Sequence, residues 1–395
     1  MNIILFDDPT IRINLLPLTF TRPVGTIRIG IFTIAEKWNN YMGSQPSFST
    51  EKYLSKKFTI KLTQDNYWIN GAVCPDPQLV NAITSLKIGE GLVKDSRMIA
   101  LRTSENEIPE VITGVVKEYS DNITIIDQVW KIFQLNGAQI REDYKLITKN
   151  RKSAGITDKY TRTYAEENIF VEEGVSIKAA LLNAENGPIY IGKNAKIHEG
   201  AMIRGPFVLC EGSEISMGAK MRGDTTIGPY SKIGGEVSNA VLFGYSNKSH
   251  DGFLGNSVIG EWCNLAADTN TSNMKNNYED IKIWNYAKEG FMDTGFMFCG
   301  LIMGDHSKCG INLMFNTGTV VGVSANIFGD GYPRTFIPSF AWGGASGFAT
   351  FQLNKALETA AKAMSRRNVV LDESDKEILT HIFDQSSKFR VWEAN

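Results

Sequence analysis

The chain has 395 residues, which is enough for two or more domains that each bury a core. Its 41 lysines and arginines nearly balance 43 aspartates and glutamates, and the net charge of −2 comes without a basic block, which argues against nucleic-acid and anionic-membrane partners. The sequence contains no apolar run of about 18 residues and no leader-like N-terminus, and its five cysteines form no C-x-x-C pair. We therefore expect a cytoplasmic protein with reduced thiols.

The first 165 residues show no repeat and mix strand-like with helix-like segments. Strands are expected over 2–6, 57–62, 67–69, 110–116 and 123–126, and helical segments over 77–86 and 128–135. Such alternation is typical of an α/β domain. We assign residues 1–165 to this domain, with a polar linker at its end.

A six-residue period dominates the next region. Aliphatic residues stand at 191, 197, 203, 209, 215, 221, 227 and 233, and the fifth residue of each unit is usually small. Neither a helix nor a single amphipathic strand sustains this period, so it predicts a solenoid. The repeat returns from Ile259 and again from Met297, giving about sixteen units, or roughly five coils at three units per coil. We assign residues 166–345 to this domain.

Two stretches interrupt the repeat, at 233–258 and at 271–297. Insertions in a solenoid project from one face and commonly build its site. Both interruptions are therefore candidate site segments. Cys263 and Cys309 fall on inward positions of the repeat and are expected to be buried thiols.

The last segment, 346–395, is predicted to be helical. Apolar residues at helical spacing indicate an amphipathic helix over 349–367. A capping-box pattern from Ser374 to Glu377 predicts the start of a second helix. We expect the two helices to cover the open end of the solenoid, where an exposed strand edge would promote aggregation.

The six-residue units resemble the hexapeptide repeat of left-handed parallel β-helix acyltransferases. That resemblance implies a left-handed solenoid with three hexapeptides per coil. It also implies a homotrimer with each acyltransferase site between protomers. Acetyl-CoA is the acyl donor that the resemblance suggests.

Leu16-Pro-Leu-Thr-Phe-Thr-Arg-Pro23 resembles the end of the signature of sugar-1-phosphate nucleotidyltransferases, R-x-x-P-L-T-x-x-x-P-K. The resemblance implies a GT-A-like domain that uses UTP or dTTP and Mg²⁺, with Arg22 as a candidate site residue and Asn136, in Phe133-Gln-Leu-Asn-Gly137, as a candidate second metal ligand. The sequence departs from the family in several ways, and Val24 stands where the signature has its final lysine. Asp7 to Asn14 replaces the glycine-rich loop that brings backbone N–H groups to the triphosphate, and the stretch from Asn70 to Asp76 lacks the family aspartate directly after glycine.

The segment from Ser249 to Asn273 resembles the acetyltransferase half of bifunctional UDP-N-acetylglucosamine pyrophosphorylase/glucosamine-1-phosphate N-acetyltransferases. His250 falls on the family's general base. By the same resemblance, Ala267 offers its backbone N–H to the thioester oxyanion, Asn264 contacts the sugar, and Asn273 orients the amine.

The resemblance also suggests how the sugar phosphate is held. Arg222 falls on a family arginine that binds this phosphate, and either Lys275 or Lys282 takes the role of a phosphate-binding lysine. Phe253 replaces a family tyrosine and removes one hydroxyl contact to substrate. This departure leaves the identity of the sugar and of the acyl donor undecided.

The chemistry explains this residue set. Only the free amine of an amino sugar attacks a thioester, so a base must accept its proton, and imidazole suits that role near neutral pH. A backbone donor stabilises the developing oxyanion, and cations fix the phosphate. We therefore predict N-acetylation of an amino-sugar 1-phosphate such as glucosamine 1-phosphate, with nucleotidyl transfer as an associated activity.

Three alternatives stay open. The first is a sugar nucleotidyltransferase without acetyl transfer, and the second is a catalytically degenerate scaffold or sugar-nucleotide-binding regulator. The third is a zinc site like that of β-helix carbonic anhydrases, built from His198, His250 and His306. Their spacing lacks the short pair expected of two ligands from neighbouring turns.

Overall fold

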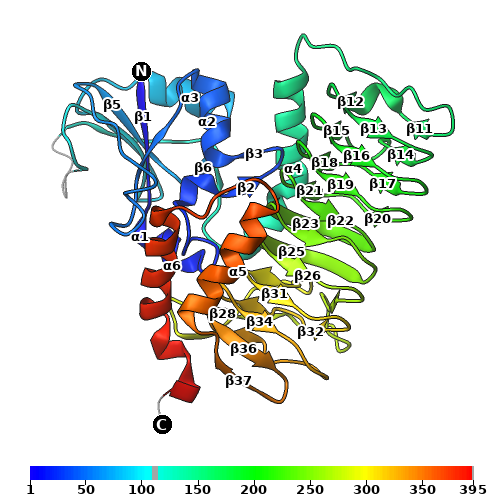
Figure 1. Cartoon of the computed structure of the whole chain (residues 1–395). Coiled ribbons are helices and arrows are strands. Elements are labelled where there is room, and N and C mark those ends of the chain that lie inside the picture. The colour runs from blue at the N-terminus through cyan, green and yellow to red at the C-terminus, as the bar shows by residue number, and fades with distance from the viewer. Residues whose placement is uncertain (109–113, 394–395) are drawn as a thin grey trace. The chain divides into compact units, whose positions relative to one another are not determined.

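The computed structural model describes residues 1–108 and 114–393 (Figure 1). They form two compact units. The first comprises 1–15, 21–27 and 32–128, and the second comprises 16–20, 28–31 and 129–395. The expected boundary near residue 165 stays a prediction, and the helix that follows Gln128 groups with the second unit.

The first unit is an α/β domain, as predicted. Its six-stranded sheet has the order β4-β1-β5-β8-β7-β9. The strands are β1 (Asn2–Phe6), β4 (Ser47–Ser49), β5 (Asn66–Asn70), β7 (Gly91–Lys94), β8 (Arg97–Thr103) and β9 (Val116–Glu118), and the helices are α1 (Pro9–Asn14), α2 (Ile34–Met42) and α3 (Pro77–Thr84). Ile4, Trp68 and Leu101 form part of its core.

The short strands expected from the sequence in this unit have different outcomes. The strand expected over 57–62 is wrong, because the chain there forms turns and irregular backbone. Its apolar residues alternate as in a half-buried strand, but Ile60 and Leu62 are 40 % and 39 % exposed, so this side of the segment is not buried against a core. The strand expected over 110–116 falls largely outside the described residues, whereas β10 (Thr124–Ile125) confirms the strand over 123–126.

The second unit is a solenoid of about 10 turns from residue 162 to 343, which confirms the predicted fold class. Each turn contributes one short strand to each of three parallel faces, which we call faces A, B and C.

The strands of the three faces are as follows. Face A contains β13 (Ser176–Ile177), β16 (Lys196–Ile197), β19 (Glu214–Ile215), β22 (Lys232–Ile233), β24 (Asn247–Lys248), β26 (Asn264–Leu265), β31 (Lys308–Cys309), β34 (Asn326–Ile327) and β36 (Ala341–Gly344). Face B contains β11 (Arg162–Tyr164), β14 (Leu181–Asn183), β17 (Met202–Arg204), β20 (Lys220–Met221) and the first halves of β23 (Glu236–Gly244) and β25 (Phe253–Glu261). The pair β27 (Asn270–Thr271) and β32 (Met314–Phe315) follows β25. Face C contains β12 (Ile169–Val171), β15 (Ile189–Ile191), β18 (Phe207–Leu209), β21 (Thr225–Ile227), the second halves of β23 and β25, β30 (Ile302–Met303), β33 (Val320–Val321) and β35 (Phe336–Ile337).

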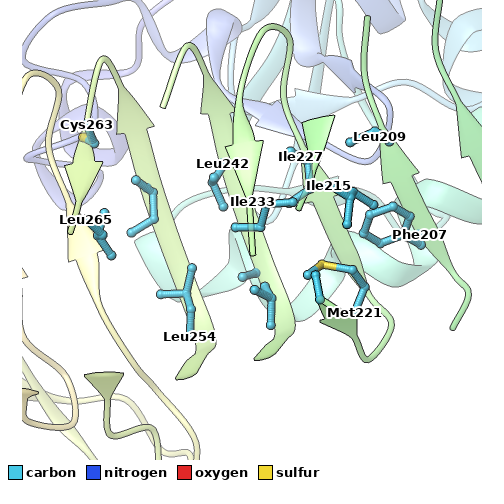
Figure 2. Close-up of a cluster of buried hydrophobic side chains, with 14 of the residues drawn as sticks. Phe207, Leu209, Ile215, Met221, Ile227, Ile233, Leu242, Leu254, Cys263 and Leu265 are labelled. Carbon is cyan, nitrogen blue, oxygen red and sulfur yellow. The ribbon is translucent and has the colours of Figure 1, made fainter. Parts of the chain in front are cut away.

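The six-residue period fills the solenoid interior. Aliphatic side chains from all three faces point inward and pack on one another (Figure 2). The small fifth residues are also buried, at 0–1 % exposure: Ala195, Ala201, Ser213, Ala219, Thr225 and Ser231. All five cysteines are buried, as predicted for the two on inward positions.

The solenoid has about twice the five coils that were predicted, in part because its coils begin near residue 162, before the repeat that was counted from Ile191. In addition, the first interruption is not an insertion but a continuation of the coils. Residues 236–244 and 253–261 are long strands that run along two faces and turn the corner at Asn239 and Asn256, both with positive φ. The inward residues Ile227, Leu242 and Ile259 pair in register, although they are 15 and 17 residues apart. Shortened coils break a count of six without breaking the parallel pairing.

The second interruption is a true insertion. It carries an antiparallel hairpin of β28 (Lys282–Asn285) and β29 (Gly290–Asp293) between two coils.

The helix α4 (Val129–Thr148) packs against face C and is much longer than the predicted 128–135 segment. Asn136, 0 % exposed, holds it there. Its Oδ1 accepts from the Gly30 N–H (2.8 Å), and its Nδ2 donates to the Asp224 carbonyl (2.9 Å) and the Thr226 hydroxyl (3.1 Å). These bonds give Asn136 a structural role in place of the expected metal-binding role, because its amide already serves backbone and hydroxyl partners.

The C-terminal segment contains two helices, α5 (Leu353–Ser365) and α6 (Glu373–Gln385), as predicted. The first begins later than expected because β37 (Gly347–Thr350) pairs with β36. Asp372, and not Ser374, caps the second, and its side chain accepts from the Asp375 N–H at 2.8 Å. No helix among the described residues is long and apolar enough to cross a membrane.

The placement of α5 corrects the expected cap. Trp392, at the chain end, packs on the last coils. However, the end of α5 reaches the middle of face A, where Arg367 Nη2 donates to Asn247 Oδ1 (3.0 Å). In Figure 1, α5 runs beside the strands of this face.

Candidate active site at His250

A cavity of about 560 Å³ lies on face A and contains His250. The strands of face A and the end of α5 form its walls. Its lining residues are Lys232, Tyr245, Asn247, Ser249, His250, Trp262, Cys263, Asn264, Lys308, Ala363, Arg366 and Arg367. Four of these carry a positive charge and none is a carboxylate, so the cavity favours an anionic ligand.

The turn from Ser249 to Gly252 presents His250. The chain leaves face A after Lys248 and enters face B at Phe253. Gly252 has a φ of 114°, and a Cβ there would lie 2.1 Å from the Thr269 carbonyl oxygen, so only glycine fits between the stacked turns. The His250 side chain is exposed at the cavity.

Lys248 lies directly below this turn. It pairs with Ile233 on the inward side of face A and is 1 % exposed. Its Nζ donates to the carbonyl oxygens of His250 (3.1 Å) and Asp251 (3.2 Å). Burial lowers the pKa of Lys248 to about 8, against the opposing attraction of Asp251. The neighbouring coils place Ile233 and Leu265, both aliphatic and buried, in this register, so the lysine serves the turn and not the core.

Two other predicted residues lie beside His250. Asn264 lines the same cavity and pairs with Asn247 and Lys308 across face A. The turn of Ala267 stacks on the turn of His250, because the Asp268 N–H donates to the Asp251 carbonyl oxygen (3.1 Å). The local fold therefore brings His250, Asn264 and Ala267 to one corner.

The remaining predicted residues lie elsewhere on the chain. Arg222 is exposed, forms an ion pair with Glu236 (2.9 Å), and lines a separate groove of about 310 Å³ on face B. Phe253 begins face B, where its N–H donates to Asn270 Oδ1 (2.8 Å). The Asn273 amide donates to Asn256 Oδ1 (2.8 Å).

The two candidate lysines belong to the insertion. Lys275 Nζ donates to the Asp280 carbonyl oxygen (2.9 Å). Lys282 begins β28 and is exposed. Neither lines the His250 cavity within this chain.

The cavity also contains residues that sequence reasoning missed. Tyr245 and Trp262 stack on each other with ring centroids 4.3 Å apart, so their faces are occupied and mainly their edges remain for a ligand. Lys308 Nζ donates to the His306 carbonyl oxygen (2.8 Å), and burial lowers the pKa of Lys308. The sequence shows the adjacent arginines Arg366 and Arg367 at the end of a predicted helix, but it does not predict that they line this cavity.

The described residues do not fit the zinc alternative. His198 Nε2 lies 2.9 Å from Glu214 Oε1, and the His306 ring stacks on Trp262 at 6.4 Å. Among residues 1–108 and 114–393, no group of three or more His, Cys, Asp or Glu side chains could hold a metal ion.

The N-terminal unit does not fit a resident Mg²⁺ either. Where the resemblance expects a loop that presents N–H groups to a triphosphate, the Asp8 carboxylate accepts from the N–H groups of Thr10 (2.9 Å) and Ile11 (3.4 Å). The Asp7 carboxylate accepts hydrogen bonds from Arg12 Nη1 (2.8 Å) and from the Thr50 hydroxyl (2.6 Å), and burial raises the pKa of Asp7. Arg22, the other candidate in this unit, is 6 % exposed.

Comparison with known proteins supports both halves of the chain. Residues 3–152 match the family model described as sugar nucleotidyl transferase. A bifunctional sugar-1-phosphate nucleotidylyltransferase/acetyltransferase of Sulfurisphaera tokodaii is 26 % identical over 283 residues, covering 63 % of this chain and 67 % of the relative. An uncharacterized acetyltransferase, YaiX of Escherichia coli O6:K15:H31, is 26 % identical over 164 residues, covering 41 % and 68 %.

Among solved structures, the polySia-specific acetyltransferase NeuO covers 50 % of this chain and 85 % of its own length, with 16 % identity and a TM-score of 0.27. The relatives with sequence similarity are transferases. The N-terminal part of the chain therefore matches the sugar nucleotidyl transferase family model, and the chain as a whole is similar to a relative named as a bifunctional nucleotidylyltransferase and acetyltransferase.

Proposed function

We propose that the solenoid transfers an acetyl group from acetyl-CoA to the amine of an amino-sugar 1-phosphate, with His250 as general base. The observation that carries this proposal is the cavity itself, where an exposed imidazole faces a space lined by four cations and no carboxylate. Imidazole accepts a proton near neutral pH, and cations bind a phosphate.

Each residue near the cavity has a distinct task in this proposal. Bound acetyl-CoA supplies the activated carbonyl carbon. His250 takes the proton from the amine as its nitrogen bonds to that carbon, and returns it to the departing thiolate sulfur. The Ala267 N–H stabilises the negative charge that develops on the carbonyl oxygen, which contributes on the order of 3 kcal/mol in comparable acyl transfers. Asn264 holds the sugar.

The proposal includes a homotrimer in the cytoplasm. Asn273, Phe253 and one of the candidate lysines Lys275 or Lys282 would complete the site between protomers. Phe291 and Phe296 on the insertion, and Phe298 just after it, are exposed aromatic side chains that a second copy would cover.

The test is thiol release from acetyl-CoA by the purified wild-type chain without any nucleotide. We expect release to rise strongly when glucosamine 1-phosphate is added and to stay at background with N-acetylglucosamine 1-phosphate, which has no free amine. If a panel of amino-sugar phosphates and acyl donors gives no release above background, the proposal is wrong and the scaffold alternative gains support.

Nucleotidyl transfer is a second candidate function, favoured by the family match of residues 3–152. The carboxylate of Asp8 at the start of α1 opposes it, because that group occupies the backbone donors and repels a triphosphate. The test is pyrophosphate release from UTP or dTTP with a sugar 1-phosphate and Mg²⁺. Sugar-dependent release that is lost in an Arg22→Gln variant supports this second function, whereas release no higher than the enzyme-free rate rejects it.

A further inference from the structure

The cations of the His250 cavity divide into two kinds by their contacts. Lys308 directs its Nζ to the backbone, with the His306 carbonyl oxygen 2.8 Å away, and burial disfavours its charge. Lys232 is held by Glu214 at 2.9 Å. Within the described part of the chain, Arg366 and Arg367 form no ion pair, so their charges are the least compensated in the cavity.

The position of the arginine pair is fixed by the fold. Arg367 Nη2 donates to Asn247 Oδ1 (3.0 Å), which ties the end of α5 to face A, and Arg366 is exposed at the same cavity. Arginine presents several N–H donors in a planar fork that matches the oxygens of a phosphate. The cations Arg222, Lys275 and Lys282 lie outside this cavity in the chain.

The aromatic residues of the cavity do not compete for this role. The faces of Tyr245 and Trp262 are stacked on each other and on Tyr230 and His306. A base or sugar ring therefore meets their edges, which give little binding energy of the stacking kind. The charge of a phosphate is then the main feature that the cavity recognises.

We infer that Arg366 and Arg367, at the end of α5, form the phosphate subsite of the His250 cavity. The ligand class is a phosphate ester, and this inference rests on the proposed function for its identity. Two sources share that chemistry, the phosphate of an amino-sugar 1-phosphate and the 3′-phosphate of coenzyme A. The arginine pair then takes the task that the family resemblance gave to Arg222.

Binding measured by calorimetry tests the inference without requiring turnover. The probes are glucosamine 1-phosphate against glucosamine, and coenzyme A against 3′-dephospho-coenzyme A, each with wild type and with Arg366→Gln and Arg367→Gln variants. We expect each variant to weaken the phosphorylated member of one pair about tenfold or more, as for loss of a charge-assisted hydrogen bond. The unphosphorylated member should bind equally well to all three proteins, and the pair that responds identifies the source.

Two controls separate the subsite from general charge effects. Lys362→Gln removes a positive charge from the same helix and should leave binding unchanged. Lys362 does not line the cavity, and its Nζ donates to Glu358 Oε1 (2.6 Å). Arg222→Gln tests the groove on face B. The inference is wrong if Arg222→Gln or Lys362→Gln weakens phosphate binding as much as the α5 variants, or if the α5 variants bind normally. Normal phosphate binding at α5 without any acetyl transfer in wild type would instead reject only the proposed function.

Discussion

Replacing His250 with glutamine is expected to lower the rate of acetyl transfer about 10²- to 10⁴-fold, the usual contribution of a positioned general base. Glutamine keeps the size and polarity of the side chain but cannot accept a proton near neutral pH. The imidazole is exposed, and the contact that fixes the turn uses the His250 carbonyl oxygen, which the variant retains. The unfolding temperature should therefore stay within a degree or two of wild type.

The measurement is thiol release at saturating amino-sugar phosphate, with kcat and KM determined separately. A His381→Gln variant is the matched control, because it removes an exposed histidine from α6, outside the cavity. It should keep full activity. Equal rates for the His250→Gln variant and wild type would remove His250 from the mechanism, even if transfer itself is confirmed.

Replacing Lys248 with methionine is expected to stabilise the protein and slow it at the same time. The lowered pKa of Lys248, about 8 against 10.5, corresponds to about 3 kcal/mol of unfavourable burial of its ammonium group. Methionine suits the inward register, while two carbonyl oxygens lose their donor. We expect a net gain of about 1–3 kcal/mol in the free energy of unfolding at pH 7.

The pH dependence of this gain has a defined sign. Below pH 8 the lysine is protonated in both folded and unfolded chains, and its full cost is present. Between pH 8 and 10.5 the folded chain loses this proton first, so the unfolded chain binds more protons and wild-type stability rises with pH. The advantage of methionine should therefore shrink across this window, as measured by urea unfolding near pH 7 and near pH 9.5.

Activity gives the second half of the Lys248 prediction. Without the two hydrogen bonds from Nζ, the turn at Ser249 to Gly252 is less fixed, and we expect kcat to fall while KM changes little. Ile233→Met, in the same inward register of the neighbouring coil, is the control. It should change stability by less than about 1.5 kcal/mol, without a pH term and without loss of kcat. A less stable Lys248→Met protein, or one with normal kcat, would contradict this account.

The two interruptions of the repeat show how much the spacing of residues can predict by itself. The hairpin at 282–293 was predicted as an insertion because a true insertion adds residues between coils that remain in phase. The first interruption has the opposite cause, since shortened coils keep their pairing while the corner residues Asn239 and Asn256 adopt positive φ. Residue counting cannot distinguish a shortened coil from an insertion, because hydrogen bonding between coils and not residue number sets the register.

The sequence by itself determined the solenoid, its aliphatic interior and its buried cysteines, because those features depend on a local period that every coil repeats. It also pointed to the turn of His250. Only the tertiary structure decided that Lys248 points inward, that Asn136 ties α4 to face C, and that Arg366 and Arg367 reach the cavity of His250, where Arg367 contacts Asn247, 120 residues earlier in the chain. These roles depend on which segments pack together. The residue type of a lysine, an asparagine or an arginine does not by itself predict which partner its side chain will contact.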